Sequence, residues 1–508
     1  MKRGLLLLVS FVLGFNLYSQ SDTSYIHTFG GIQDDGCKQI QATPDGGYIT
    51  IGTTNSFGVG NTDFYVIKTD SLCNFKWSRT YGGPLNDEGF SVTNTRDGGY
   101  AFVGFTDSYG AGGYDVFLVK TDGLGNVEWQ KTYGGSNWDF GYSVQQTNDG
   151  GFVICGLTYS YGNSDGDVYI IRTNSVGDTL WTKTFGGQGY DVGNQIAVRH
   201  DSLYIIAGAT TSYGVGDTNA MLLQINDKGT IEWTKTYGGD SNNFRFNSVH
   251  LTPDNALLMY GSTDSISDSV HSNSYENEYF LKTDTFGVPL VAHDMDSPQE
   301  GFGADARQLA DGTFITMGSN ESYGAGQLDF HIYHLNSSSF FIAGPTFGGV
   351  KNEMVGSMAF GKNGDVVFAG SSNTYPTYSA GLYDVFIVRV TSTNLFGGYD
   401  TVVTRFIDTT QWLSSIPKVQ FKVGVTVFPN AVSSLATILV QGSDFEKYAY
   451  NMYDINGNRI INNAPLNSIG HGQAVAKFER GNIPAGEYLY EIISNGSKKV
   501  ASGKLIIE

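Results

Sequence analysis

The chain has 508 residues, a formal net charge of −19 and only 16% charged residues. This excess of negative charge argues against nucleic acid or an anionic membrane surface as a partner. The 67 glycines, 32 phenylalanines and 31 tyrosines are typical of short strands joined by tight turns, so we predict an all-β protein with room for two or more domains.

Residues 1–19 have the pattern of a secretory signal peptide. Lys2 and Arg3 precede an apolar run that is too short to span a bilayer stably, and Ser19 is a small residue at the expected cleavage site. No later segment has about 18 consecutive apolar residues, so we expect no transmembrane helix in the mature protein. The three cysteines are an odd and sparse set, which does not suggest a disulfide framework.

A short motif then recurs every 52 residues. Its copies are WSRTYGG at Trp77, WQKTYGG at Trp129, WTKTFGG at Trp181 and WTKTYGG at Trp233. Within the unit from Asn86 to Gly135, four strand signals are separated by turns rich in Gly and Asx, which supply the positive φ that hairpins require. Four antiparallel strands in a unit of this length are the pattern of a β-propeller blade.

The expected third strand of each unit gives a count of the blades. Its start recurs at Asp63, Asp115, Asp167, Asn219, Asn277, Asp329 and Asp384, which predicts seven blades within residues 20–394. The seventh unit has no room for a fourth strand, whereas a lone half-copy, YIHTFGG, precedes the first unit. We therefore expect Ser24–Phe29 to complete the seventh blade and close the ring, which leaves no strand edge free. The alternative is an open solenoid of β-repeats, which requires neither seven units nor a displaced strand.

Laid out as DGGYAFVGFTDS…GGYDVFLVKTDGLGNVEW, the repeats resemble a family of bacterial β-propeller repeats found in exported proteins. They are also distantly similar to the propeller repeats of quinone-cofactor proteins, which share a D-x-x-G-x-x-x-W turn. The first resemblance covers Tyr25 to about Asn394. It implies the fold but no particular function, because propellers carry many unrelated activities.

The 52-residue period is absent from the C-terminal part of the chain. Residues 395–424 are predicted to be an irregular linker, and residues 425–508 return to an alternating pattern with Asn-Gly turns. We predict from this pattern a β-sandwich of about eighty residues. The predicted architecture is therefore a seven-bladed β-propeller closed by the N-terminal strand, followed by a small C-terminal β-sandwich.

Residues 425–508 resemble the type A C-terminal sorting domain of proteins exported by the type IX secretion system of Bacteroidetes. The matching segments are Phe428-Pro429-Asn430, Asp454-Ile455-Asn456-Gly457, Pro484–Tyr488 and Lys504–Ile507, while Ala431 replaces the Pro usual in the family. The resemblance implies that this domain engages the outer-membrane secretion machinery and is then cleaved. The protein would then be secreted or attached to the outer cell surface. The alternative is an ordinary accessory sandwich.

Two sets of side chains recur on the face where propellers usually bind ligands. An acidic residue begins the first strand in five units: Asp35, Asp87, Asp139, Asp191 and Glu353. Such carboxylates can hold Ca²⁺ or a cationic group, or can accept backbone N–H bonds from their own Gly-Gly loops, and we favour the second interpretation. An aromatic residue followed by Gly occupies the loop between strands two and three: Phe57, Tyr109, Tyr161, Tyr213 and Tyr323. These rings either stack on sugars or wedge against a neighbouring blade, and again we favour the structural interpretation.

Residues that break the repeat are the better candidates for ligand contacts. Trp138 occurs in one unit only and is the strongest single candidate. Units five and six depart most from the repeat, at Arg245, His250, Asp305 and Arg307. The predicted ligand contacts are therefore Trp138, the four loop tyrosines, Arg245 and Arg307.

Catalytic signatures are sparse in this sequence. It contains no G-x-S-x-G, H-E-x-x-H or C-x-x-C motif, and His331 and His334 lie three residues apart on an expected strand, so they point to opposite faces. We predict no catalytic residue, no metal site and no cofactor. The preferred function is a non-catalytic, exported propeller that binds a glycan or a protein. The alternatives are a polysaccharide-active enzyme, either a glycosidase or a lyase, and a purely structural surface protein.

Overall fold

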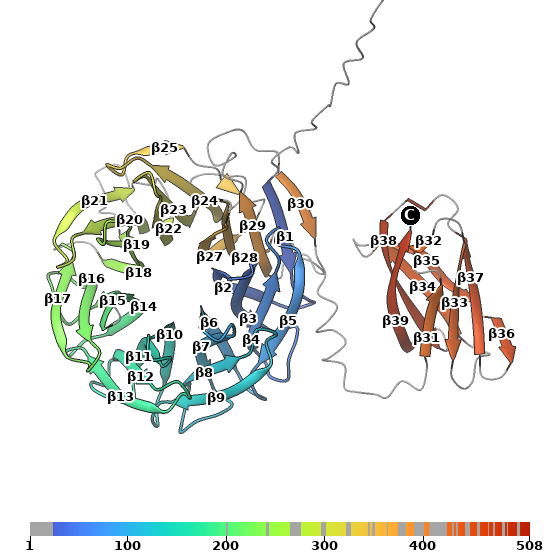
Figure 1. Cartoon of the computed structure of the whole chain (residues 1–508), viewed down its shortest axis with the longest axis horizontal. Helices are drawn as coiled ribbons and strands as arrows, with labels where there is room; N and C mark the ends of the chain where they lie inside the picture. The colour runs from blue at the N-terminus through green and yellow to red at the C-terminus, as the bar shows by residue number, and fades with distance from the viewer. Residues whose placement is uncertain are drawn as a thin grey trace, which may run out of the picture.

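The computed structural model describes residues 24–199, 202–239, 243–264, 276–295, 301–321, 327–343, 346–347, 351–362, 364–373, 383–390 and 401–405, and in the C-terminal part residues 424–428, 431–432, 435–441, 448–454, 458–465, 467–470, 473–479, 483–484, 486–494 and 498–507. The predicted signal peptide lies outside these ranges. The regular structure of the described residues consists of β-strands (Figure 1). Within the same ranges, no helix has the length and apolar character needed to cross a membrane.

The described strands between Ser24 and Arg405 form seven sheets. The first four sheets are β2 (Asp35–Ala42), β3 (Tyr48–Thr54), β4 (Asp63–Thr69) and β5 (Phe75–Tyr81); β6 (Asp87–Asn94), β7 (Tyr100–Thr106), β8 (Asp115–Thr121) and β9 (Val127–Tyr133); β10 (Asp139–Gln146), β11 (Phe152–Thr158), β12 (Asp167–Thr173) and β13 (Thr179–Phe185); and β14 (Asp191–Arg199), β15 (Leu203–Thr210), β16 (Asn219–Asn226) and β17 (Ile231–Tyr237).

The next three sheets are β18 (Phe244–Leu251), β19 (Leu257–Asp264), β20 (Glu276–Thr283) and β21 (Pro289–Met295); β22 (Gly301–Gln308), β23 (Phe314–Asn320), β24 (Asp329–Leu335), β25 (Phe341–Ala343) and β26 (Thr346–Phe347); and β27 (Glu353–Phe360), β28 (Val366–Ser372), β29 (Asp384–Val390), β1 (Ser24–Phe29) and β30 (Thr401–Arg405). We call these sheets blades one to seven in this order.

The blades surround a central opening, with β2, β6, β10, β14, β18, β22 and β27 innermost (Figure 1). This arrangement is a β-propeller, as the sequence predicts. The third strands of six blades begin at the predicted residues, and β20 begins one residue earlier than predicted, at Glu276. The regular 52-residue period therefore located the strands well.

Strand β1 lies in the blade that also contains β27, β28 and β29. It pairs antiparallel with β29 from Tyr25 opposite Arg389 to Phe29 opposite Val385. One correction concerns its other edge. Thr401–Arg405, which we predicted to belong to an irregular linker, form β30 and pair in parallel with β1. The pairing with β29 leaves the other edge of β1 open, so the segment that follows the last blade can add a strand at that edge.

The hydrophobic core is divided among the interfaces between neighbouring blades. One cluster joins Ile51 of blade one to Phe102 of blade two, and the equivalent cluster joins Phe29 and Ile387 of blade seven to Tyr65 of blade one. Strands two and three of the blades are buried along most of their length, for example throughout β8. Because both faces of each blade pack against a neighbour, these strands are continuously apolar rather than alternating.

The recurring W-x-x-x-(Y/F)-G-G motif joins each blade to the next. Tyr133 donates its hydroxyl to the Gly177 carbonyl at 2.6 Å, in the turn between strands three and four of the following blade, and Tyr81 does the same to Gly125 at 2.8 Å. The Trp77 ring packs on that turn: a Cβ added to Gly125 would lie 2.9 Å from it, and Gly125 has a φ of 78°. Only glycine meets both requirements, so the motif recurs for structural reasons.

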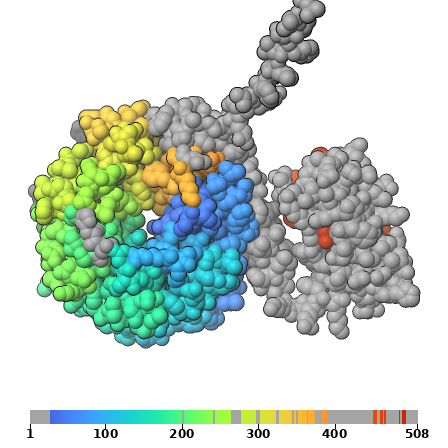
Figure 2. All heavy atoms as spheres, viewed as in Figure 1, coloured from blue at the N-terminus to red at the C-terminus, as the bar shows by residue number. Residues whose placement is uncertain are grey.

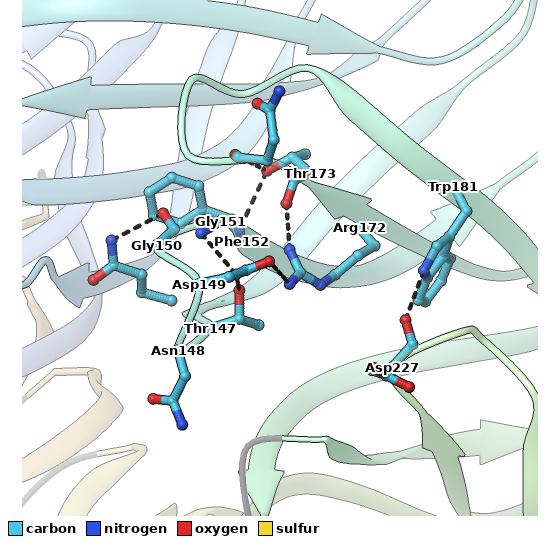
Figure 3. A network of polar contacts seen from close by, with 12 residues as sticks. Thr147, Asn148, Asp149, Gly150, Gly151, Phe152, Arg172, Thr173, Trp181 and Asp227 are labelled. Carbon is cyan, nitrogen blue, oxygen red and sulfur yellow. Dashed lines mark hydrogen bonds and ion pairs between the residues drawn. The ribbon is translucent and has the colours of Figure 1, made fainter.

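A second recurring contact ties the turn between strands one and two to the end of strand three. In blade three, Arg172 Nη2 lies 2.6 Å from Asp149 Oδ2, and Asp149 Oδ1 accepts hydrogen bonds from Thr147 and from the Gly151 N–H (Figure 3). Equivalent ion pairs are Lys68–Asp45, Lys120–Asp97, Lys282–Asp254 and Arg389–Asp365. This recurrence again indicates a role in the fold of each blade.

The described C-terminal strands form two sheets. One has the order β31 (Gly424–Phe428), β33 (Leu435–Gln441), β37 (Gln473–Glu479) and β36 (Asn467–Gly470). The other has the order β32 (Ala431–Val432), β39 (Lys498–Ile507), β38 (Gly486–Ser494), β34 (Tyr448–Asp454) and β35 (Arg459–Pro465). The predicted Asn-Gly turns at 456–457 and 495–496 lie outside the described residues, but the strands on either side of each are paired.

Candidate functional site

Every innermost strand of the propeller contains a β-bulge at the same position. The register with the second strand shifts between Gly89 and Ser91 in blade two, between Gly141 and Ser143 in blade three, and at the equivalent place in the other blades. A bulge leaves one residue out of the pairing and changes the direction of its side chain. The seven bulge residues are Lys38, Phe90, Tyr142, Asn194, Asn247, Ala304 and Gly356.

All seven bulge residues line one cavity of about 660 Å³ at the centre of the ring, which we call the channel cavity. The opening at the centre of the ring is visible in the space-filling view (Figure 2). On one side of the cavity, the rings of Phe90 and Tyr142 meet edge to face at 5.2 Å, and Lys38 Nζ lies 5.7 Å from the centre of the Phe90 ring. Ala304 and Gly356 have the smallest side chains among the seven bulge residues of the lining.

In six of the seven blades, the residue after the bulge holds neighbouring blades together around the channel. Its side-chain oxygen accepts a backbone N–H from the inner strand of another blade: Gln39 from Val92 at 2.6 Å, Ser91 from Val144 at 3.2 Å, Ser143 from Ile196 at 3.2 Å, Gln195 from Val249 at 2.6 Å, Asp305 from Met358 at 3.1 Å and Ser357 from Ile40 at 2.8 Å. The last of these bonds joins blade seven to blade one. This set of bonds makes the wall of the channel cavity a connected frame.

An aromatic strip runs from the channel cavity to the surface through blades two and three. It consists of Phe90, Tyr142, Phe140, Tyr114 and Trp138. Successive ring centres are 5.2, 6.0, 5.7 and 6.0 Å apart, and the Phe140 and Tyr142 rings are stacked. Trp138 is 54% exposed, and the other four rings are partly exposed. The strip is therefore a continuous aromatic surface with its outer end at the predicted residue Trp138.

The loop tyrosines have a structural partner. The hydroxyls of Tyr109, Tyr161 and Tyr213 donate to the carbonyls of Gly82, Gly134 and Gly186, at 3.1, 2.7 and 2.6 Å. Each hydroxyl thus holds the first glycine of a Gly-Gly link between blades, although the rings remain about 40% exposed. Phe57 is buried, and Tyr323 lies outside the described residues.

The acidic residues that begin the first strands are buried and bound to their own loops. Asp87 Oδ2 accepts hydrogen bonds from the Gly83 N–H at 2.7 Å and from the Ser108 hydroxyl at 2.8 Å. Asp35, Asp139 and Asp191 accept the equivalent pairs from Gly31 and Ser56, Gly135 and Ser160, and Gly187 and Ser212. This confirms for these four aspartates the favoured interpretation that the carboxylates cap the Gly-Gly loops, whereas Glu353 accepts a hydrogen bond from the Ser372 hydroxyl at 2.9 Å.

The residues that break the repeat in blades five and six fall into two separate places. Arg245 pairs with Glu276 and lines a small cavity of about 210 Å³ with Thr218 and Phe244. His250 and Arg307 instead both bind Asp305 at the channel: Asp305 Oδ1 lies 2.8 Å from His250 Nε2 and 2.6 Å from Arg307 Nη1. Neither predicted arginine lines the channel cavity itself, but Arg307 binds Asp305, which does, and Arg307 and His250 line a second cavity of about 370 Å³.

The electrostatics of this cluster follow from its burial. Burial alone would raise the pKa of Asp305, but Arg307 and His250 outweigh it and hold that pKa below the usual value. Burial, together with the nearby Arg307, lowers the pKa of His250. At neutral pH the imidazole is therefore neutral, and its Nε2–H donates to the Asp305 carboxylate.

Other candidates for chemistry are explained by local contacts. His331 Nε2 lies 2.6 Å from Glu278 in the interior, whereas His334 Nε2 contacts the Thr313 hydroxyl at 3.0 Å, so the two histidines have different partners as expected. All three cysteines are buried and unpaired. Within the described ranges, no group of three or more His, Cys, Asp or Glu is arranged to hold a metal ion.

Sequence reasoning missed the bulge residues, with none of the seven among the predicted contacts. A signal for them exists in the sequence. The fourth residue of the first strand is Phe90 in the second unit, Tyr142 in the third and Asn194 in the fourth, while the Asp and Gly before it recur. Pairing cannot be read from one strand, however, so nothing in the sequence shows that this position leaves the ladder.

No protein-family model matches the chain, and no curated protein matches it in sequence. Among solved structures, it is similar to a fungal alcohol oxidase of the AA5 family in complex with copper, with 11% identity, coverage of 95% of this chain and 98% of that chain, and a TM-score of 0.46. The WD40 domain of Neurospora crassa Pan2 has 11% identity, coverage of 71% and 91%, and a TM-score of 0.42. The β-propeller domain of the Trilobed protease from Pyrococcus furiosus has 9% identity, coverage of 72% and 99%, and a TM-score of 0.39. Similarity at this level supports no statement about activity.

Proposed function

We propose that this chain is an exported, non-catalytic propeller that binds a glycan through the channel cavity and the aromatic strip. The observation that carries the proposal is the continuity of the two surfaces. Phe90 and Tyr142 line a cavity of about 660 Å³, and from Tyr142 the ring contacts continue through Phe140 and Tyr114 to the exposed Trp138. Ligand sites typically combine such apolar surfaces with a few fixed polar groups.

The polar groups of the channel cavity suit the hydroxyls of a sugar. Asn194 and Asn247 donate their amide N–H groups to the carbonyls of Phe246 and Gly303, both at 2.8 Å. Their amide oxygens are then left to accept hydrogen bonds from a ligand, in positions held by the next blade. Aromatic faces with nearby acceptors favour a glycan over the alternative ligand, a protein surface.

The proposal includes the finer architecture. Seven blades are closed by the pairing of β1 with β29, and residues 425–508 form a sandwich that sorts the chain to the outer-membrane type IX machinery. The pairing register and the bond from Ile40 to Ser357 support the closure. The two C-terminal sheets support the sandwich, and the sorting role rests on the sequence resemblance.

A glycan array probed with residues 20–508 tests the binding. We expect a saturable hit that Trp138→Ala weakens about fivefold, since one aromatic contact is worth about 1 kcal/mol. Tyr161→Ala is the matched control, because this ring is similarly exposed but lies outside the strip. A hit that responds equally to both substitutions would place the glycan elsewhere. The absence of any glycan or protein ligand would favour a purely structural surface protein.

A polysaccharide-active enzyme is the second candidate, and one observation favours it. His250, oriented by Asp305 and adjacent to Arg307, is a neutral imidazole that lines the second cavity of about 370 Å³, which is the arrangement of a general base. Reducing-end and unsaturated-product assays on any glycan that binds distinguish the candidates. Turnover that is lost in His250→Gln while binding persists would replace the binding proposal with a catalytic one.

A further inference from the structure

A second cavity follows the later half of the inner strands. Its volume is about 370 Å³, and its polar lining includes Gln39, Gln41, Gln145, Gln195, His250 and Arg307. We call it the glutamine cavity. None of its described lining residues is Asp or Glu, although the whole chain has a net charge of −19. A cavity without carboxylates in so acidic a protein suggests a ligand that carries negative charge itself.

The orientation of three glutamines is determined by the blades next to them. The side-chain oxygens of Gln39, Gln41 and Gln195 accept backbone N–H bonds at 2.6, 2.9 and 2.6 Å. A backbone N–H can be accepted only by the oxygen of a primary amide, so the NH₂ group must be the end that is left free. Each of these side chains lines the glutamine cavity, so the cavity is rich in N–H donors that are already positioned.

Arg307 supplies the positive charge. Its Nη1 binds Asp305 at 2.6 Å, and the side chain is 23% exposed where it borders the cavity. Asp305 is only 2% exposed and also binds His250 and the Met358 N–H, so its oxygens are occupied. A guanidinium has five N–H donors. Asp305 and the Ala306 carbonyl use two of them, so others remain for a ligand.

We propose that the glutamine cavity binds an anionic group, a carboxylate or a sulfate. Arg307 provides the charge, and the amide NH₂ groups of Gln39, Gln41 and Gln195 provide further donors. Charge-assisted hydrogen bonds from such groups are the strongest available to a carboxylate or sulfate. The volume of about 370 Å³ admits a small ligand or the charged end of a larger one. Gln39 and Gln195 also line the channel cavity, so the two cavities share part of their wall, but the anion site rests on this lining and not on the proposed glycan.

Isothermal titration of residues 20–508 with sodium sulfate and with sodium glucuronate, at constant ionic strength, tests the site directly. Glucose serves as the neutral control. We expect saturable binding of at least one anion and at least about tenfold weaker binding in Arg307→Gln, which corresponds to about 1.4 kcal/mol. Arg245→Gln is the matched control, because Arg245 also pairs with a carboxylate but lies outside this cavity. The proposal is wrong if neither anion binds saturably, or if both substitutions weaken binding equally.

A second variant covers the case in which Arg307→Gln does not fold. Gln145 lines the cavity and is partly buried, and Gln145→Glu keeps the size of the side chain while adding a negative charge. We expect Gln145→Glu to keep the wild-type melting temperature and to weaken anion binding at least about tenfold. Unchanged anion affinity in the folded Gln145→Glu protein would overturn the proposal. Sulfate binding without glucuronate binding would assign the site to sulfate esters, and the reverse would assign it to carboxylates.

Discussion

The proposed closure of the ring predicts that strand β1 contributes a large part of the stability of the propeller. The strand buries two apolar side chains on opposite faces of blade seven. Ile26 packs in the cluster shared with blade six, which contains Phe330, and Phe29 packs in the cluster shared with blade one, which contains Tyr65. The substitutions Ile26→Ala and Phe29→Ala therefore each weaken a different interface of the last blade.

The expected magnitudes follow from burial. Phe29 is 0% exposed and Ile26 is 2% exposed. Truncation of a buried Phe to Ala costs about 3–5 kcal/mol, and truncation of a buried Ile costs about 2–5 kcal/mol. Because the two side chains lie in separate clusters, the costs should add, to about 5–10 kcal/mol. That sum is comparable with the whole folding free energy of a typical domain, so the double variant should lose the closed ring.

Urea unfolding followed by tryptophan fluorescence measures the effect. Val127→Ala is the control, because Val127 lies on the outer strand β9 and is exposed, so its truncation should change the unfolding free energy by less than about 0.5 kcal/mol. If Ile26→Ala and Phe29→Ala each cost no more than Val127→Ala, then β1 is a docked tail and the closure model is refuted. Hydrogen exchange in β29, the antiparallel partner of β1, should rise in the double variant before exchange rises in blade three.

Three further outcomes test other parts of the structure. Tyr133→Phe removes the hydrogen bond to Gly177 and should lower the unfolding free energy by about 1 kcal/mol in a urea titration. The reverse change Phe185→Tyr, at the equivalent position of the next blade, should raise it. If the two substitutions change the unfolding free energy by the same amount and with the same sign, the role given to the motif is contradicted. Burial raises the pKa of Asp63 from 3.8 to about 6, so the folded chain binds this proton more strongly, and the resulting stability is lost as pH rises through about 6. The stability of the wild type relative to Asp63→Asn should therefore be about 1 kcal/mol greater at pH 5 than at pH 7, and no pH dependence of that difference would disprove the shift. Removal of residues 425–508 should leave the chain inside the cell envelope by fractionation and immunoblot, whereas unchanged export would exclude a sorting role.

The order and type of the strands were predictable because the repeat carries several consistent local signals. Turns rich in Gly and Asx mark both hairpins of a unit, and the runs between them have the length and apolar character of buried strands. The pairing of Thr401–Arg405 with β1 was not predictable in the same way. Its partner lies at the opposite end of the propeller sequence, and a strand that adds to an edge left open by chain connectivity shows no motif of its own.

The candidate site was predictable only in part. Trp138 was identified because it occurs in one unit, and it does form the exposed end of the aromatic strip. The loop tyrosines were identified by their recurrence, and the structure shows why recurrence favoured a structural role. In the three that it describes, Tyr109, Tyr161 and Tyr213, the hydroxyl binds a glycine carbonyl of the chain's own link between blades. Arg245 and Arg307 look alike in the sequence, and only the tertiary structure separates them.

The two rings of residues around the channel show where ligand specificity can reside. The residues after the bulges, among them Gln39, Ser91 and Asp305, all have a side-chain oxygen, because most of them must accept an N–H from another blade. The bulge residues themselves share no chemical property, since they range from Lys38 to Gly356. The backbone directs these side chains into the channel cavity. The fold constrains some of them: Asn194 and Asn247 donate to carbonyls of the next blade, and a Cβ added to Gly356 would lie 2.5 Å from the Lys38 carbonyl oxygen. Positions where the fold sets no such requirement can be selected by the ligand, so bulge residues such as Phe90 and Tyr142 are the place to seek what this propeller binds.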